Sequence, residues 1–115
     1  MTDVPRPAFY RLIDKQPVPS GDGPGFQTLW QIQVGPFWVS TVFLGVDLSF
    51  RLPSRGPLLF ETMVFDGMDH AYQLRCETWE GAEAQHQRAV HIADGMDRAG
   101  ASSLAAFRAT FEAPD

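Results

Sequence analysis

Glu83 and His86 form the first candidate site, because their residue types and spacing would let the two side chains act together. They are three positions apart, which places a carboxylate and an imidazole on one face of a helix. Glu-x-x-His supplies ligands in di-iron helical bundles, but a second copy of the motif and further carboxylates complete those sites. The chain has one copy, and His70 and His91 have no cysteine or histidine at ligand spacing. We therefore expect no metal and no other cofactor.

Glu61 is the second candidate, because it lies in the apolar run 58–65 with Leu59, Met63 and Phe65 on its face. A carboxylate in such surroundings is paired, hydrogen-bonded or shifted in pKa. As a general acid or base it would face His86 across the interface between sheet and helix. As a structural residue it would form an ion pair with Arg75 on the neighbouring strand, which is the interpretation we favour.

Other residues of nucleophilic type lack the surroundings that catalysis needs. Ser40 and Thr41 precede Asp47, a potential orienting acid, but no G-x-S-x-G turn surrounds the serine. Cys76 has no base nearby in sequence and is typical of a small packed side chain. No glycine-rich strand–loop–helix sequence indicates a phosphate site. The pattern favours a non-catalytic protein; the alternative is a small enzyme or metal-dependent protein that uses Glu61, His86 and Asp47.

Charge is distributed unevenly over the 115 residues and their net charge of −5. Residues 1–60 carry five cations and four anions, whereas residues 61–115 carry four cations and ten anions. Direct nucleic-acid binding is not expected, because phosphate contacts need clustered cations. Glu80 and Glu83 are expected on a solvent-facing helix surface, which is either simply solvated or a docking surface for a basic partner protein.

Length and composition also limit the classes of protein to which the chain can belong. The length corresponds to a single domain over 1–115. The single cysteine excludes an intramolecular disulfide. No apolar run approaches the roughly 18 residues of a membrane span, and the N-terminus has no signal-peptide apolar region, so we expect a cytoplasmic protein. A homodimer is compatible with these features.

Hydrophobic periodicity predicts an α+β fold. Alternation predicts strands over 8–14, 30–34 and 71–77, a run rich in β-branched and aromatic residues predicts a strand over 37–44, and a nearly continuous apolar run predicts one over 58–65. Gly35-Pro36 joins the strands 30–34 and 37–44 as an antiparallel hairpin. The Pro/Gly-rich stretch 16–25 is expected to be an irregular loop. Thr78 caps a predicted helix over 78–95, and the tail 97–115 contains a short helix with Leu104, Phe107 and Phe111 inward. We expect an antiparallel sheet of about five strands with the main helix across one face.

The aromatic residues have two interpretations. Trp30, Trp38 and Trp79 could fill the space between sheet and helix. Alternatively, Phe37 and Trp38, beside the hairpin turn, would be exposed and form a contact site for a partner.

Four segments, in this order, resemble a family of small uncharacterised proteins encoded by bacteriophages and by prophage regions of bacterial genomes. They are FYRLID (9–14), STVFLGVD (40–47), PLLFETMVF (57–65) and TWEGAEAQH (78–86). Residues 16–29 depart from the family, whose members tend to have a short acidic helix there, and the tail after residue 96 has no counterpart. The resemblance implies a phage accessory protein that acts inside a bacterial cell, where its partner would be a host or phage protein. Inhibition of a host-defence complex is one such role, since an acidic face can occupy a site meant for nucleic acid. The resemblance implies no activity for any residue.

Overall fold

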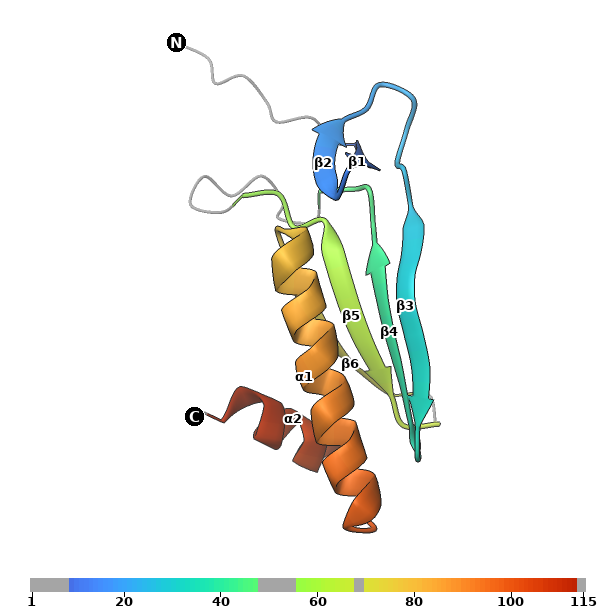
Figure 1. Ribbon diagram of the computed structural model, residues 1–115, viewed down its shortest axis with the longest axis vertical. Coiled ribbons are helices and arrows are strands. Elements are labelled where there is room, and N and C mark those ends of the chain that lie inside the picture. The colour runs from blue at the N-terminus through green and yellow to red at the C-terminus, as the bar shows by residue number, and fades with distance from the viewer. Residues whose placement is uncertain (1–8, 48–55, 68–69, 114–115) are drawn as a thin grey trace.

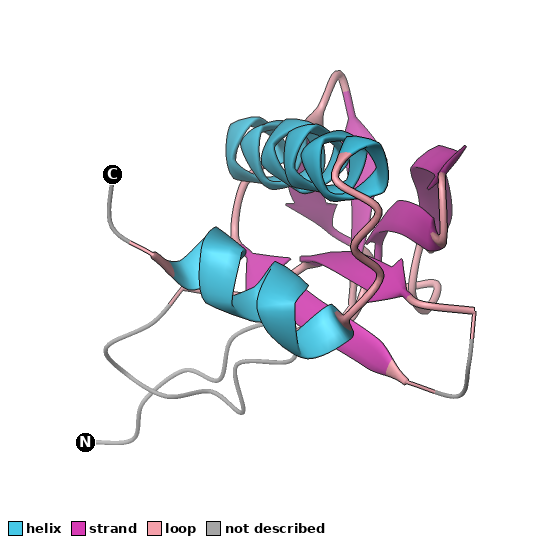
Figure 2. Cartoon of the chain, turned by 90° about the horizontal axis from the view of Figure 1, so that it is seen from below, coloured by secondary structure: helices cyan, strands magenta, loops and turns pink. Residues whose placement is uncertain are grey.

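The computed structural model describes residues 9–47, 56–67 and 70–113. The predicted α+β class is confirmed. The main sheet is an antiparallel meander of β3 (Gln27–Val34), β4 (Phe37–Phe43), β5 (Phe60–Phe65) and β6 (Ala71–Cys76), in that order. Helices α1 (Trp79–Arg98) and α2 (Leu104–Glu112) follow and lie on the same side of this sheet (Figures 1 and 2).

The first strand pairs not with the main sheet but with a strand that the sequence did not predict. Strands β1 (Tyr10–Ile13) and β2 (Gln16–Pro19) form a separate two-stranded hairpin, so the irregular loop expected over 16–25 is wrong for its first residues. Asp14 and Lys15 both have positive φ, as a two-residue type I′ turn requires. In this register Gln16 and Val18 direct their backbone groups toward β1, whereas Pro17 and Pro19 alternate with them and direct theirs away from it. Their missing N–H groups therefore cost the ladder nothing.

A close backbone approach attaches this hairpin to the main sheet. The Tyr10 N–H donates to Gly45 O and the Gly25 N–H donates to Tyr10 O, both at 2.9 Å. A Cβ at Gly45 would lie 2.6 Å from the Gly25 nitrogen, and Gly45 has a φ of +73°. Only glycine fits this position without displacing the backbone. Tyr10 is thereby buried beside Phe43, Leu59 and Phe60.

The predicted hairpin around Gly35-Pro36 is confirmed. Val34 pairs with Phe37 across the two-residue turn, and Gly35 has a φ of +56°. Leu29 is an extra residue at a β-bulge, since Thr28 pairs with Val42 and Trp30 with Thr41. A Cβ at Gly35 would collide with the side chain of Asp97, so the tip of this hairpin meets the last turn of α1.

Both helices begin at the side-chain caps that the sequence indicates. The Thr78 hydroxyl accepts from the Gly81 N–H at 3.0 Å, and the Ser103 hydroxyl accepts from the Ala106 N–H at 3.2 Å. Along α1 the stripe of small residues Ala82, Ala89 and Ala93 is fully buried, which lets the helix approach the sheet closely. The hydrophobic core lies between the helices and one sheet face, with Phe107 of α2 against Phe37.

Neither helix of the described residues is long and apolar enough to cross a membrane.

Candidate binding groove

Glu61 has the structural role that the sequence favours. Its carboxylate accepts from Arg75 Nε at 3.0 Å, and the two residues are direct partners in the β5–β6 register. Thr62, the next residue, points to α1, so Glu61 lies on the opposite face of the sheet from that helix. The interpretation of Glu61 as an acid or base facing His86 is therefore wrong.

His86 is instead bonded to a pair of threonines in the core. Its Nδ1 lies 2.8 Å from Thr41 Oγ1, which lies 2.7 Å from Thr62 Oγ1. Both threonines are fully buried, and the imidazole contacts the Trp30 ring at a centroid distance of 5.6 Å. Burial lowers the pKa of His86, because a charged imidazole loses hydration there. The neutral ring can accept the Thr41 proton at Nδ1 while its Nε2–H remains as a donor.

The remaining candidates for catalysis are dispersed. Asp47 Oδ1 accepts from the Leu58 N–H at 3.3 Å, which fixes the chain before β5. Burial raises the pKa of the Cys76 thiol, which opposes thiolate formation. Glu83 is exposed, and the described residues include no group of three or more His, Cys, Asp or Glu side chains that could hold a metal ion. The structure therefore does not bring Glu61, His86 and Asp47 together.

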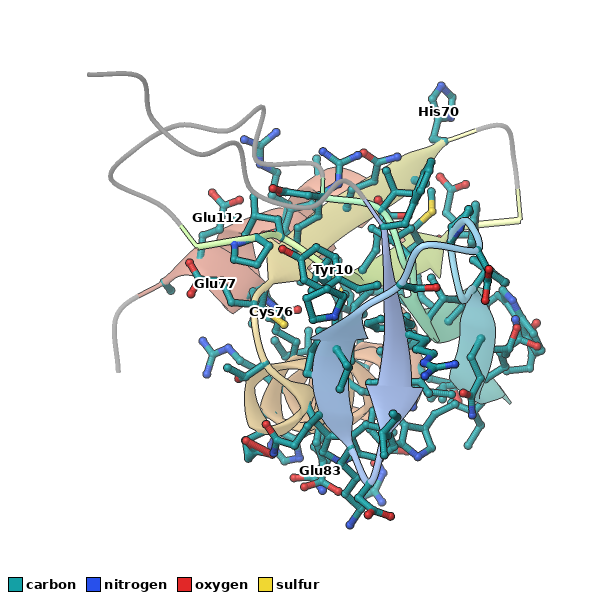
Figure 3. All side chains as sticks on the ribbon, turned by 90° about the horizontal axis from the view of Figure 1, so that it is seen from above. Tyr10, His70, Cys76, Glu77, Glu83 and Glu112 are labelled. Carbon is teal, nitrogen blue, oxygen red and sulfur yellow. The ribbon has the colours of Figure 1, made fainter. Side chains whose placement is uncertain are left out.

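The predicted contact residues fall in three different places. Glu80 and Glu83 are exposed in the first two turns of α1, as predicted, and Figure 3 shows Glu83 directed away from the sheet. Trp38 is half-buried on the sheet face opposite the helices. Phe37 is 0% exposed, so its expected role in surface contact is wrong. It turns inward because the two-residue turn places Phe37, Val39, Thr41 and Phe43 on the face toward α1.

A groove of about 790 Å³ runs between strand β3 and helix α1. We call it the β3–α1 groove, and its lining comprises Gln31, Ile32, Gln33, Val34, His86, Gln87, Val90, His91 and Asp94. Its volume is in the range of about 300–1,000 Å³ that small-ligand sites occupy, but it is wide open to solvent on one side. Four consecutive strand residues form one wall, and helix residues one turn apart form the other.

The chemistry of this groove is apolar at its base and polar without strong charge at its margins. Ile32 is 43% exposed there, and Val34 and Val90 are half-buried. Asp94 is the one carboxylate of the lining, and Arg98 pairs with it at 3.1 Å. Amide and imidazole groups supply the other hydrogen bonds. Such a surface binds by shape and hydrogen bonding; the lining has no nucleophile beside a base.

Sequence reasoning did not find the β3–α1 groove, although it identified β3 and α1 separately. The two walls of the groove come from residues about 55 positions apart in the sequence, and no local sequence pattern predicts that they lie side by side. One signal was present. Strand β3 reads QTLWQIQV, without a charge or a proline, which is unusual for a strand that lies at the edge of the sheet formed by the described residues.

These features define, for the described residues, a two-layer α+β protein with a lateral groove between β3 and α1. No family model, no curated protein and no solved structure matches the chain.

Proposed function

We propose that this protein is a non-catalytic accessory protein of phage or prophage origin, which acts inside a bacterial cell by binding an extended segment of a host protein in the β3–α1 groove. The groove itself carries the proposal, because it is an open surface with an exposed apolar residue between two rigid elements. The resemblance of four segments to phage-encoded proteins supports the biological setting. An inhibitor of a host-defence complex is one role that fits such a protein.

The dimensions of the groove favour an extended polypeptide. The helix wall extends from His86 to Asp94, which is about 12 Å at the rise of an α-helix. The strand wall from Gln31 to Val34 is about 10 Å long. Three to four residues of an extended chain occupy this length at about 3.3 Å each. Alternate side chains would rest on Ile32 and Val90, while backbone groups would meet the side-chain amide of Gln87.

The test is an affinity measurement with a groove variant and a matched control. Host proteins are captured from a bacterial lysate on the wild type, and each candidate is then purified and titrated. Ile32→Glu places a charge in the groove, whereas Ile13→Glu places the same charge on β1, where the isoleucine is 45% exposed. We expect the dissociation constant to rise at least tenfold for Ile32→Glu and to stay within twofold for Ile13→Glu. Equal affinity of the wild type and Ile32→Glu would contradict the proposal.

A further inference from the structure

We infer that the β3–α1 groove is one half of a larger cleft, and that a second copy of the chain supplies the other half by pairing with it along β3. This inference rests on the proposed function, because it identifies the missing wall of the same groove. Three observations carry it: the edge that β3 leaves open, the register in which that edge matches itself, and the width of the cleft that results.

Strand β3 is an edge of the main sheet that the described residues leave uncovered. It pairs with β4 on one side only, and Figure 1 shows β3 at the margin of the molecule. In a two-residue hairpin alternate residues pair their backbone groups, so those of Gln31 and Gln33 point away from β4. Edge strands are commonly protected by charge, by proline or by shortness. Strand β3 has eight residues and neither charge nor proline, whereas the opposite edge β6 carries Arg75 and contacts α2.

The edge matches itself in one antiparallel register. A two-fold axis at Ile32 sets Ile32 beside Ile32, Trp30 beside Val34, and Gln31 opposite Gln33. Apolar side chains then meet on the helix side of the sheet and amides meet on the other side. An axis at Gln31 would set Gln33 against the bulge residue Leu29, and an axis at Gln33 would set Gln31 against the turn at Gly35. Only the register centred on Ile32 pairs all five residues from 30 to 34 with residues of the same stretch in the second copy.

The resulting dimer has room for one polypeptide between its helices. Helix α1 lies over the middle strands β4 and β5, about one and a half strand spacings from β3. In the dimer, the distance between the two helix axes is the sum of both helix offsets and the new spacing between the paired β3 strands, which is four strand spacings. At about 4.8 Å each, this distance is about 19 Å. Subtracting a helix diameter of about 10 Å leaves a cleft about 9 Å wide. This width suits an extended chain above a floor of paired β3 strands.

The symmetry also keeps like charges apart. The two α1 helices run in opposite directions across the cleft, so Asp94 of one copy lies toward the end at which the other copy has Trp30 and His86. Both copies use the same edge, so pairing stops at two chains. The second copy is the occupant of the edge, and the host segment is the occupant of the cleft.

Disulfide trapping tests the register. In a Cys76→Ser background, Ile32→Cys puts a cysteine on the two-fold axis, where directly opposite residues of a non-hydrogen-bonded pair have Cβ atoms about 4.5–5.5 Å apart. We expect mild oxidation to convert most of this variant to a covalent dimer. Ile13→Cys, with similar exposure but on β1, and Gln33→Cys, off the axis, are controls that should stay largely uncoupled. Coupling of Ile13→Cys to the same extent would overturn the inference.

Sedimentation equilibrium supplies the second measurement. The wild type should have twice the 12.8 kDa mass of the chain at micromolar concentration. Gln33→Pro removes one outward N–H and should shift the protein to the monomer, while Gln33→Ala should leave the dimer intact. A wild type that stays monomeric at several hundred micromolar overturns the inference.

The two proposals fail separately. A monomer that still binds a host segment in an Ile32-dependent manner refutes the dimer and leaves the proposed function standing. A dimer with the trapped register whose host partner is unaffected by Ile32→Glu refutes the groove as the host site and leaves the dimer standing.

Discussion

Replacing Thr41 should destabilise the protein more than the small size of this side chain suggests. Its hydroxyl joins Thr62 to His86 in the core, so Thr41→Val keeps the shape and leaves two buried polar atoms without this partner. Unsatisfied buried groups cost about 1–3 kcal/mol. We expect Thr41→Val to lower the free energy of unfolding by that amount in urea titrations. Thr28→Val, at an exposed threonine of β3, is the control and should change it by less than about 0.5 kcal/mol. Equal effects of the two variants would contradict this role.

His86 should make stability depend on pH in a defined direction. Burial holds its folded-state pKa below the ordinary value of about 6.5, so folding favours the neutral ring. The contribution of His86 is therefore fully present above pH 6.5 and is lost as the pH falls through the folded-state pKa. We expect the urea midpoint to decline between pH 7 and pH 5 more steeply for the wild type than for His86→Gln. Parallel declines would show that other groups cause the effect.

At the scale of elements, a hydrogen bond between Tyr72 and Glu112 joins helix α2 to the sheet beside the aromatic contacts of that helix. The Tyr72 hydroxyl donates to Glu112 at 2.8 Å, and Arg108 donates to the same carboxylate oxygen at 3.0 Å. The hydrogen bond from Tyr72 lowers the pKa of Glu112, and burial followed by the contact with Glu112 raises the pKa of Tyr72 to about 12. The contact therefore joins the C-terminal helix to β6 at neutral pH.

The alkaline limb of the stability profile tests this contact. The folded protein keeps Tyr72 protonated to a pH of about 12, whereas an unfolded tyrosine loses its proton near pH 10. Stability from this group is present below pH 10 and is lost as the pH rises toward 12. Tyr72→Phe should lower the free energy of unfolding by about 0.5–1.5 kcal/mol at pH 7 and should flatten the decline above pH 10. An unchanged alkaline decline in Tyr72→Phe would argue against the contact.

Local sequence patterns predicted most of the helices and strands. The features that they did not predict depend on contacts between residues far apart in the sequence. Alternation located β3 and β6, runs of apolar and β-branched residues located β4 and β5, and the helical spacing of apolar residues located α1 with its cap at Thr78. Pro17 and Pro19 concealed β2, because a proline reads as a strand breaker until the register shows which N–H groups the ladder needs. The ion pair of Glu61 was predictable from its strand neighbour Arg75, but the bond between His86 and Thr41 depends on how the helix lies across the sheet.

At the scale of the whole molecule, the acidic half of the chain should influence association more than folding. Glu80 and Glu83 are both exposed near the N-terminus of α1, and Glu80, in the first turn, contributes about a few tenths of a kcal/mol through the helix dipole. Glu80→Lys and Glu83→Lys should each leave the melting temperature nearly unchanged and slow association with a basic partner at low salt, a difference that high salt removes. Stopped-flow or biosensor kinetics would measure this.

An exposed acid elsewhere controls for net charge in that experiment. Asp22→Lys makes the same change in charge in the loop after β2. Rates equal to that control would reduce the acidic surface to a solvated face.

The meeting of Gly35 with Asp97 links the lengths of two elements. Because the hairpin tip touches Asp97 in the last turn of α1, a change in the length of either element alone would separate the two sides of this contact. Two residues added to each of β3 and β4 would advance the tip by about 7 Å, and about four to five residues added to α1 would match them. A lineage that carried this fold could therefore gain or lose length at this end only in coupled steps, so that paired insertions in hairpin and helix would survive where either insertion alone would not.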